Sequence, residues 1–126
     1  ELLTPIYEDE SITHLSTFNQ QLIRRISKYL GIETEFRNAS EFNVSGDRVG
    51  KLITMCEMVG ADAYLSGPAA KDYITDEFDE IPIELKWMEY GPYDEYPQRS
   101  EPFSHYVSII DTIAMMGKST KQHIFG

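Results

Sequence analysis

At 126 residues the chain is long enough for one compact domain with one hydrophobic core, and too short for two. Its net charge of −10 repels nucleic acid and anionic lipid, so neither is an expected partner. No apolar run approaches transmembrane length and no signal peptide is recognisable, so we expect no membrane insertion. The single cysteine, Cys56, excludes an internal disulfide and fits a cytoplasmic location.

The first half of the chain predicts two amphipathic helices with a strand between them. Apolar residues recur at helical spacing over residues 15–30, and Gly31 is placed to end that helix. Residues 32–36 alternate apolar and charged side chains, which predicts a half-buried strand that closes near Ser40. A second helix is expected over residues 45–60.

The stretch after this second helix predicts a buried strand that turns sharply into a further helix. Residues 63–65 suit a strand covered on both faces. Gly67 allows a tight turn, and Pro68 suits the first position of a helix capped by Ser66 or Gly67. Ligands of open α/β sheets collect outside the carboxyl ends of strands, so this turn is the first place to expect a site.

The last third predicts one more strand, a long loop and a final helix. Residues 83–87 alternate as a strand does, and residues 91–102 form a loop dense in Pro and Tyr. The final helix carries Tyr106 and three isoleucines and stops at Gly117, and the polar residues 118–126 are expected to be a loose tail.

This order of elements predicts an α/β fold. We expect a small three-layer unit with a short, mainly parallel sheet of about three strands flanked by helices, as part of a larger α/β domain. Because so small a sheet leaves an edge open, self-association or another half of the protein is expected to cover it. The expected core residues are Leu22, Ile26, Leu52, Cys56, Leu65, Trp87 and Ile110.

Acidic residues are concentrated in the second half of the chain. Residues 72–101 hold ten carboxylates against Lys86 and Arg99, so this stretch carries most of the net charge. We favour a solvated face, which keeps a protein soluble, over a cation-binding surface.

Three separate motifs occur one after another along the chain. Residues 64–73 read Tyr-Leu-Ser-Gly-Pro-Ala-Ala-Lys-Asp-Tyr, residues 96–98 read Tyr-Pro-Gln, and residues 103–111 read Phe-Ser-His-Tyr-Val-Ser-Ile-Ile-Asp. Together they resemble the WbqC-like family over nearly the whole chain. The resemblance implies a bacterial protein of surface-polysaccharide (O-antigen) biosynthesis, suspected to be a transferase. The family's N-terminal half, with its His-Gln-Pro and Pro-Trp signature, has no counterpart here, so the chain is expected to be the C-terminal half of a WbqC-like domain.

The candidate site residues follow the predicted strands or lie in the Pro- and Tyr-rich loop and the helix after it. His105 and Asp111 are the catalytic candidates, but six positions apart on one helix they face different directions, so that helix alone holds no catalytic triad. The substrate-binding candidates are Ser40, Ser66, Gly67, Asp72, Tyr73, Tyr96, Gln98 and Ser108.

Several of these candidates also have a structural interpretation. His105 fits a general acid–base or ligand contact as well as a hydrogen-bonded structural histidine. For Ser66 we favour helix capping over ligand binding, and Asp72 serves the helix dipole as readily as a substrate. The tyrosines form either an aromatic wall for a sugar or the edge of a core, and the core is slightly favoured.

The carboxyl ends of parallel strands share one rim, which predicts a single pocket. Ser66, Gly67, Tyr96, Gln98 and His105 are expected to line it, with the N–H groups of the Pro68 helix directed at a phosphate or sulfate. The scattered histidines and single cysteine give no metal spacing, and no Gly-rich nucleotide loop occurs, so neither metal nor cofactor is expected.

Two functional hypotheses remain. In the first, the chain is part of a transferase for a nucleotide- or lipid-linked sugar, whose active site needs the other half of the protein. In the second, it is a non-catalytic binding or assembly module of a polysaccharide-synthesis complex. Activity restored by the other half favours the first hypothesis, and tight binding to another protein of the pathway favours the second.

Overall fold

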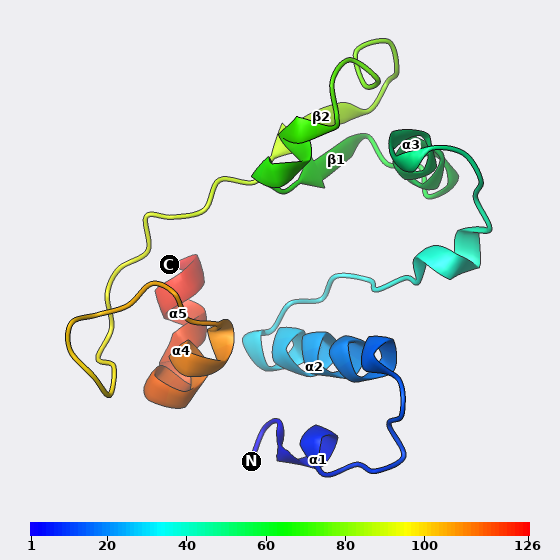
Figure 1. Ribbon diagram of the computed structural model, residues 1–126. Helices are drawn as coiled ribbons and strands as arrows, with labels where there is room; N and C mark the ends of the chain where they lie inside the picture. Colours follow the sequence, from blue (N-terminus) through cyan, green and yellow to red (C-terminus); the bar gives the residue numbers. More distant parts are fainter. The chain divides into compact units, whose positions relative to one another are not determined.

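The computed structural model describes residues 1–126, and the chain divides into two compact units (Figure 1). Unit 1 comprises Glu1–Phe36 together with Tyr93–Gly126, and unit 2 comprises Arg37–Pro92. The expectation of a single domain stays a prediction. No helix combines the length and apolar character needed to cross a membrane.

Unit 1 is helical. Its elements are α1 (Thr4–Tyr7), α2 (Leu15–Leu30), α4 (Ile109–Met116), the 3₁₀ helix η3 (Gly117–Ser119) and α5 (Thr120–Phe125). The helix predicted over residues 15–30 is confirmed. Gly31 ends it at φ 71°, and the N–H of Ile32 reaches back to the carbonyl of Ser27 at 2.8 Å. Helix α1 packs on α2 through an edge contact between the rings of Tyr7 and Phe18, 5.1 Å apart.

The end of the chain differs from the loose tail expected over residues 118–126, because η3 and α5 form there. Thr120 has no exposed surface, and its hydroxyl donates to the carbonyls of Gly117 at 2.7 Å and Thr112 at 3.3 Å. A polar composition suggested solvent exposure, but a hydroxyl with two carbonyl acceptors can be buried at little cost.

Unit 2 contains a short parallel sheet, which confirms the α/β class. Its elements are the 3₁₀ helix η1 (Ala39–Phe42), α3 (Arg48–Met58), β1 (Ala63–Ser66), the 3₁₀ helix η2 (Pro68–Asp72) and β2 (Glu84–Trp87). The two strands pair in parallel, with Ala63 opposite Glu84 and Ser66 opposite Trp87. A parallel pair needs a long connection, which η2 and the loop after it provide.

The sheet has two strands instead of the expected three, because residues 32–36 join no sheet. Their side chains alternate as expected, but their backbone pairs with no strand. Instead the Arg24 guanidinium donates to the carbonyl of Phe36 at 3.1 Å and lies over its ring at 5.1 Å. Side-chain contacts therefore replace the expected ladder of backbone hydrogen bonds.

The core of unit 2 is apolar. Its buried members are Val49, Cys56, Ala70, Ile74, Phe78 and Ile83. The ring of Phe78 stacks on Tyr64 with the centroids 5.6 Å apart. Burial raises the pKa of the Cys56 thiol, and the negative charge of Glu57 raises it further.

The prediction of burial is wrong for two of the seven expected core residues. Leu65 is 54% exposed because it lies on the uncovered face of β1, and Ile110 is 39% exposed in the first turn of α4. Of the others, Cys56 is buried and the remaining four are partly buried.

Candidate functional site

The hydroxyl of Tyr96 is the centre of a hydrogen-bond network in unit 1. Tyr96 lies in the Pro- and Tyr-rich loop, is 9% exposed, and donates its hydroxyl proton to Asp111 Oδ2 at 2.7 Å. The hydroxyl oxygen of Tyr96 in turn accepts a hydrogen bond from the hydroxyl of Thr112, at 3.1 Å. The loop is thereby tied to the first turn of α4. We call Tyr96, Gln98, Ser104, Asp111 and Thr112 the Tyr96 network.

Gln98 closes the loop between residues 98 and 104. Its side-chain oxygen accepts the N–H of Ser104 at 2.9 Å, and its Nε2 donates to the Ser104 carbonyl at 3.0 Å. This pairing copies the two hydrogen bonds that neighbouring strands exchange. Nε2 also donates to Asp111 Oδ2 at 3.2 Å, so Gln98 joins the loop to the carboxylate.

Asp111 keeps one oxygen for other partners. Oδ2 accepts from both Tyr96 and Gln98, whereas no group of the chain donates to Oδ1. The carboxylate is only partly buried, so Oδ1 is open to a ligand. An ionised carboxylate oxygen held in a fixed orientation can accept a hydroxyl hydrogen bond or a proton.

Aromatic rings pack against the ring of Tyr96. Phe103 and His123 both meet the Tyr96 ring edge-on, with centroids 5.2 and 5.4 Å away. His105 in turn lies edge-on to Phe103 at 4.8 Å. Tyr96 therefore contacts aromatic rings through its own ring and the Asp111 carboxylate through its hydroxyl.

The structure places the ten predicted site residues in two groups. Unit 1 holds Tyr96, Gln98, His105, Ser108 and Asp111, and unit 2 holds Ser40, Ser66, Gly67, Asp72 and Tyr73. Within unit 1, hydrogen bonds join Tyr96, Gln98 and Asp111. His105 is exposed and forms no hydrogen bond with Asp111. Ser108 caps α4 by accepting the N–H of Ile110 at 3.2 Å.

The unit 2 candidates have mostly structural surroundings. Ser66 is 6% exposed at the end of β1, and its carbonyl accepts the N–H of Met88 at 2.8 Å. Tyr73 carries the guanidinium of Arg48 over its ring at 3.5 Å. Ser40 is exposed in η1. Whether any of them binds a substrate stays a prediction.

The segment that begins at Pro68 is shorter than the helix expected there. Only the five-residue η2 forms there, and the N–H of Ala70 already bonds to the Gly67 carbonyl at 3.0 Å. Asp72 is the last residue of η2 and so lies outside its first turn. Gly67 has φ −71°, which any residue adopts, so the turn does not depend on glycine there.

Sequence reasoning missed several members of the site: Phe103, Ser104, Thr112 and His123. His123 was missed because it lies in α5, where a loose tail was expected. A sequence signal was available, since Thr112 directly follows Asp111 in the third motif and so shares its helical turn.

Comparison with known proteins identifies the class of this chain. The model of the WbqC-like protein family matches residues 1–123. The chain belongs to the WbqC-like family. It is 33% identical over 123 residues to the uncharacterized protein Rv1507c of Mycobacterium tuberculosis, covering 97% of this chain and 53% of that protein. The chain thus spans about half the length of this curated relative. No solved structure matches it significantly.

Proposed function

We propose that this chain is the C-terminal part of a cytoplasmic transferase of bacterial surface-polysaccharide (O-antigen) biosynthesis, acting on a nucleotide- or lipid-linked sugar. The sugar binds at the Tyr96 network. The observation that carries the proposal is the open Oδ1 of Asp111, held beside aromatic rings by hydrogen bonds from Tyr96 and Gln98 to Oδ2. Membership of the WbqC-like family supports the pathway.

The network suits a sugar because it combines fixed polar groups with neighbouring aromatic rings. Tyr96 and Gln98 fix the orientation of the Asp111 carboxylate, so little freedom is lost when Oδ1 accepts a sugar hydroxyl. Phe103 packs edge-on against Tyr96, and His105 packs on Phe103. In this proposal Asp111 Oδ1 accepts a hydrogen bond or a proton from a sugar hydroxyl, and the exposed His105 supplies a further contact.

An NMR titration of the chain with UDP-glucose tests this proposal by binding, because activity is expected to need the rest of the protein. We expect amide shifts over residues 96–111. Asp111→Asn keeps the size of the side chain but removes its charge, and should weaken binding about tenfold or more. Asp79→Asn, an exposed aspartate of unit 2, is the matched control and should bind as the unchanged chain does. Unchanged affinity in Asp111→Asn would refute the proposal.

A second candidate function is a non-catalytic assembly module. It is favoured by the surroundings of the two catalytic candidates: His105 is exposed and packs on Phe103, whereas Asp111 bonds to Tyr96 and Gln98, so the two do not act as a pair. A longer protein that contains this chain separates the two functions. Turnover of a sugar nucleotide that falls sharply in His105→Ala or Asp111→Asn supports the transferase. Turnover unaffected by both variants supports the assembly module.

A further inference from the structure

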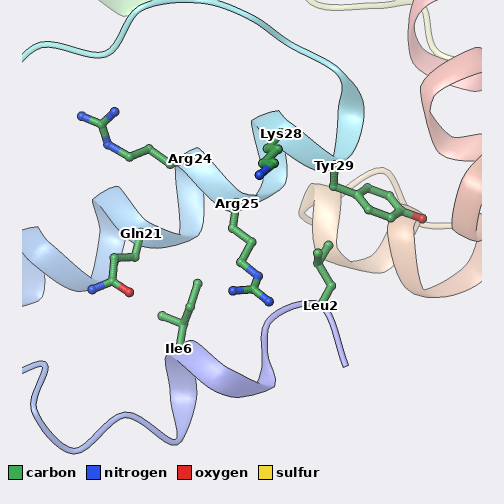
Figure 2. A pocket seen from close by; sticks show the side chains of 7 residues that line it. All are labelled: Leu2, Ile6, Gln21, Arg24, Arg25, Lys28 and Tyr29. Atoms are coloured by element: carbon green, nitrogen blue, oxygen red, sulfur yellow. The ribbon is translucent and has the colours of Figure 1, made fainter.

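A hollow in unit 1, separate from the Tyr96 network, lies between α1 and the C-terminal half of α2 (Figure 2). Its volume is about 690 Å³. We call it the basic groove, and the residues that line it are Leu2, Ile6, Gln21, Arg24, Arg25, Lys28 and Tyr29. Three of these side chains are cationic and none is acidic.

The polar side chains of the basic groove come from one face of α2. Gln21, Arg24, Arg25 and Lys28 follow at intervals of three, one and three residues, which places them on adjoining turns of the same face. Figure 2 shows the Arg25 side chain extending from α2 toward α1, where Ile6 and Leu2 lie. Ile6 is 4% exposed and forms part of the apolar floor.

No acidic group of the chain neutralises these cations. Residues 11–32 contain no Asp or Glu, although the whole chain has a net charge of −10. Arg24 is held by the carbonyl and ring of Phe36, and neither Arg25 nor Lys28 has an ion pair. The helix dipole explains a cation only in the last turn, which accounts for Lys28 but not for Arg24 or Arg25.

We propose that the basic groove binds the diphosphate group of a ligand. Arginine forks and a lysine ammonium are the groups that hold phosphate oxygens, and the Gln21 amide adds two donors. Tyr29, at 37% exposure, and Leu2 border the groove as an aromatic and an aliphatic surface for whatever the diphosphate carries. The proposed function implies that the group attached to the diphosphate is a nucleoside or a lipid that carries the sugar. Diphosphate binding itself does not depend on the proposed function.

Calorimetric and NMR titrations with inorganic pyrophosphate test the groove directly. We expect amide shifts on α1 and α2, and affinity that falls between 50 and 200 mM salt because the contacts are electrostatic. The double variant Arg25→Ala with Lys28→Ala should lose about tenfold or more in affinity. The control is Lys51→Ala with Lys118→Ala, which removes the same charge from exposed positions outside the groove, and its affinity should stay within about twofold.

Equal losses in both double variants would show a response to net charge alone and would overturn the proposal. So would the absence of binding, or shifts confined to residues outside α1 and α2. A native amide spectrum of the Arg25 and Lys28 variant guards against misfolding, and Arg25→Lys, which keeps the charge, gives a second measurement that should lose less affinity.

UDP-glucose and farnesyl diphosphate distinguish the two carriers. Tighter binding of UDP-glucose than of pyrophosphate supports a nucleotide carrier, and tighter binding of farnesyl diphosphate supports a lipid carrier. If neither ligand binds more tightly than pyrophosphate, the inference that the groove also recognises a nucleoside or lipid is refuted. In the UDP-glucose titration, shifts on α2 without shifts over residues 96–111 would refute the sugar site and support the groove. Shifts over residues 96–111 without shifts on α2 would refute the groove and support the sugar site.

Discussion

The interiors of the two units differ in chemistry. Unit 2 buries six apolar side chains around a parallel strand pair, with Ser66 as its one buried polar residue. Unit 1 buries as many polar residues as apolar ones: Ser27, Thr112 and Thr120 against Ile6, Leu30 and Tyr96. Unit 2 therefore depends mainly on apolar burial, and unit 1 depends on satisfying its buried hydroxyls.

This difference separates stability from positioning. Apolar contacts are non-directional, so the core of unit 2 stabilises without orienting any reactive group. Hydrogen bonds are directional, so the Tyr96 network fixes the orientation of the Asp111 carboxylate. The unit with the more polar interior is the one that holds both the candidate sugar site and the basic groove.

The largest effect is expected from Phe78→Ala in unit 2. Removing this buried ring leaves a cavity against Tyr64 and should lower the free energy of unfolding by about 3–5 kcal/mol. Urea denaturation followed by the fluorescence of Trp87, the sole tryptophan, measures it. Tyr90→Ala, an aromatic that is 67% exposed, is the control. A loss below about 1 kcal/mol for Phe78→Ala would contradict the apolar core.

Tyr96→Phe should weaken unit 1 by about 1–3 kcal/mol, because it removes the donor to Asp111 and the acceptor of the buried Thr112 hydroxyl. Hydrogen exchange should show faster exchange of the α4 amides with unit 2 unchanged. Tyr93→Phe, at an exposed tyrosine of the same loop, should have no effect. Equal loss of protection in both units would mean that the network does not act locally.

Leu65→Asn tests the uncovered face of β1. At 54% exposure this side chain should change the free energy of unfolding by no more than about 0.5 kcal/mol in dilute solution. We expect the same substitution to weaken self-association at high concentration, measured by sedimentation, because a second copy is expected to cover the open sheet. An unsubstituted chain that stays monomeric at high concentration would contradict this expectation.

The smallest effect concerns Glu41 in unit 2. The Arg37 guanidinium at 2.8 Å, followed by the Asn38 N–H at 3.0 Å, holds the pKa of the Glu41 carboxyl below its ordinary value. Its stabilising contribution is therefore present above the unfolded pKa of about 4.3 and is lost as the pH falls through the lower folded value. NMR titration should show this low midpoint, and Arg37→Ala should raise it.

Local patterns predicted most of the fold. The period of residues 15–30 and the αL glycine at Gly31 were enough for α2, and alternation was enough for β2. Residues 32–36 show the limit, because a strand needs a partner that a local pattern does not reveal. Leu65 shows a second limit, since an apolar strand residue gives no sign of how many faces of its sheet are covered.

The candidate site was predictable only as a set of residue types. Tyr96, Gln98 and Asp111 were chosen from motifs, and the structure joins them by hydrogen bonds. Their partners Ser104 and Thr112 were missed because they contribute through a backbone group or through a hydroxyl buried by tertiary packing. The basic groove was not predicted because the net charge of −10 describes the whole chain, whereas α2 contains no Asp or Glu.

The division of unit 1 into two segments affects how the protein is made. A ribosome completes residues 37–92, and with them all of unit 2, before α4 and α5 exist. During this interval, on the order of seconds at usual elongation rates, α1 and α2 have none of their C-terminal partners. The basic groove has all its lining residues in the first of the two segments, whereas the Tyr96 network can form only when α4 has emerged.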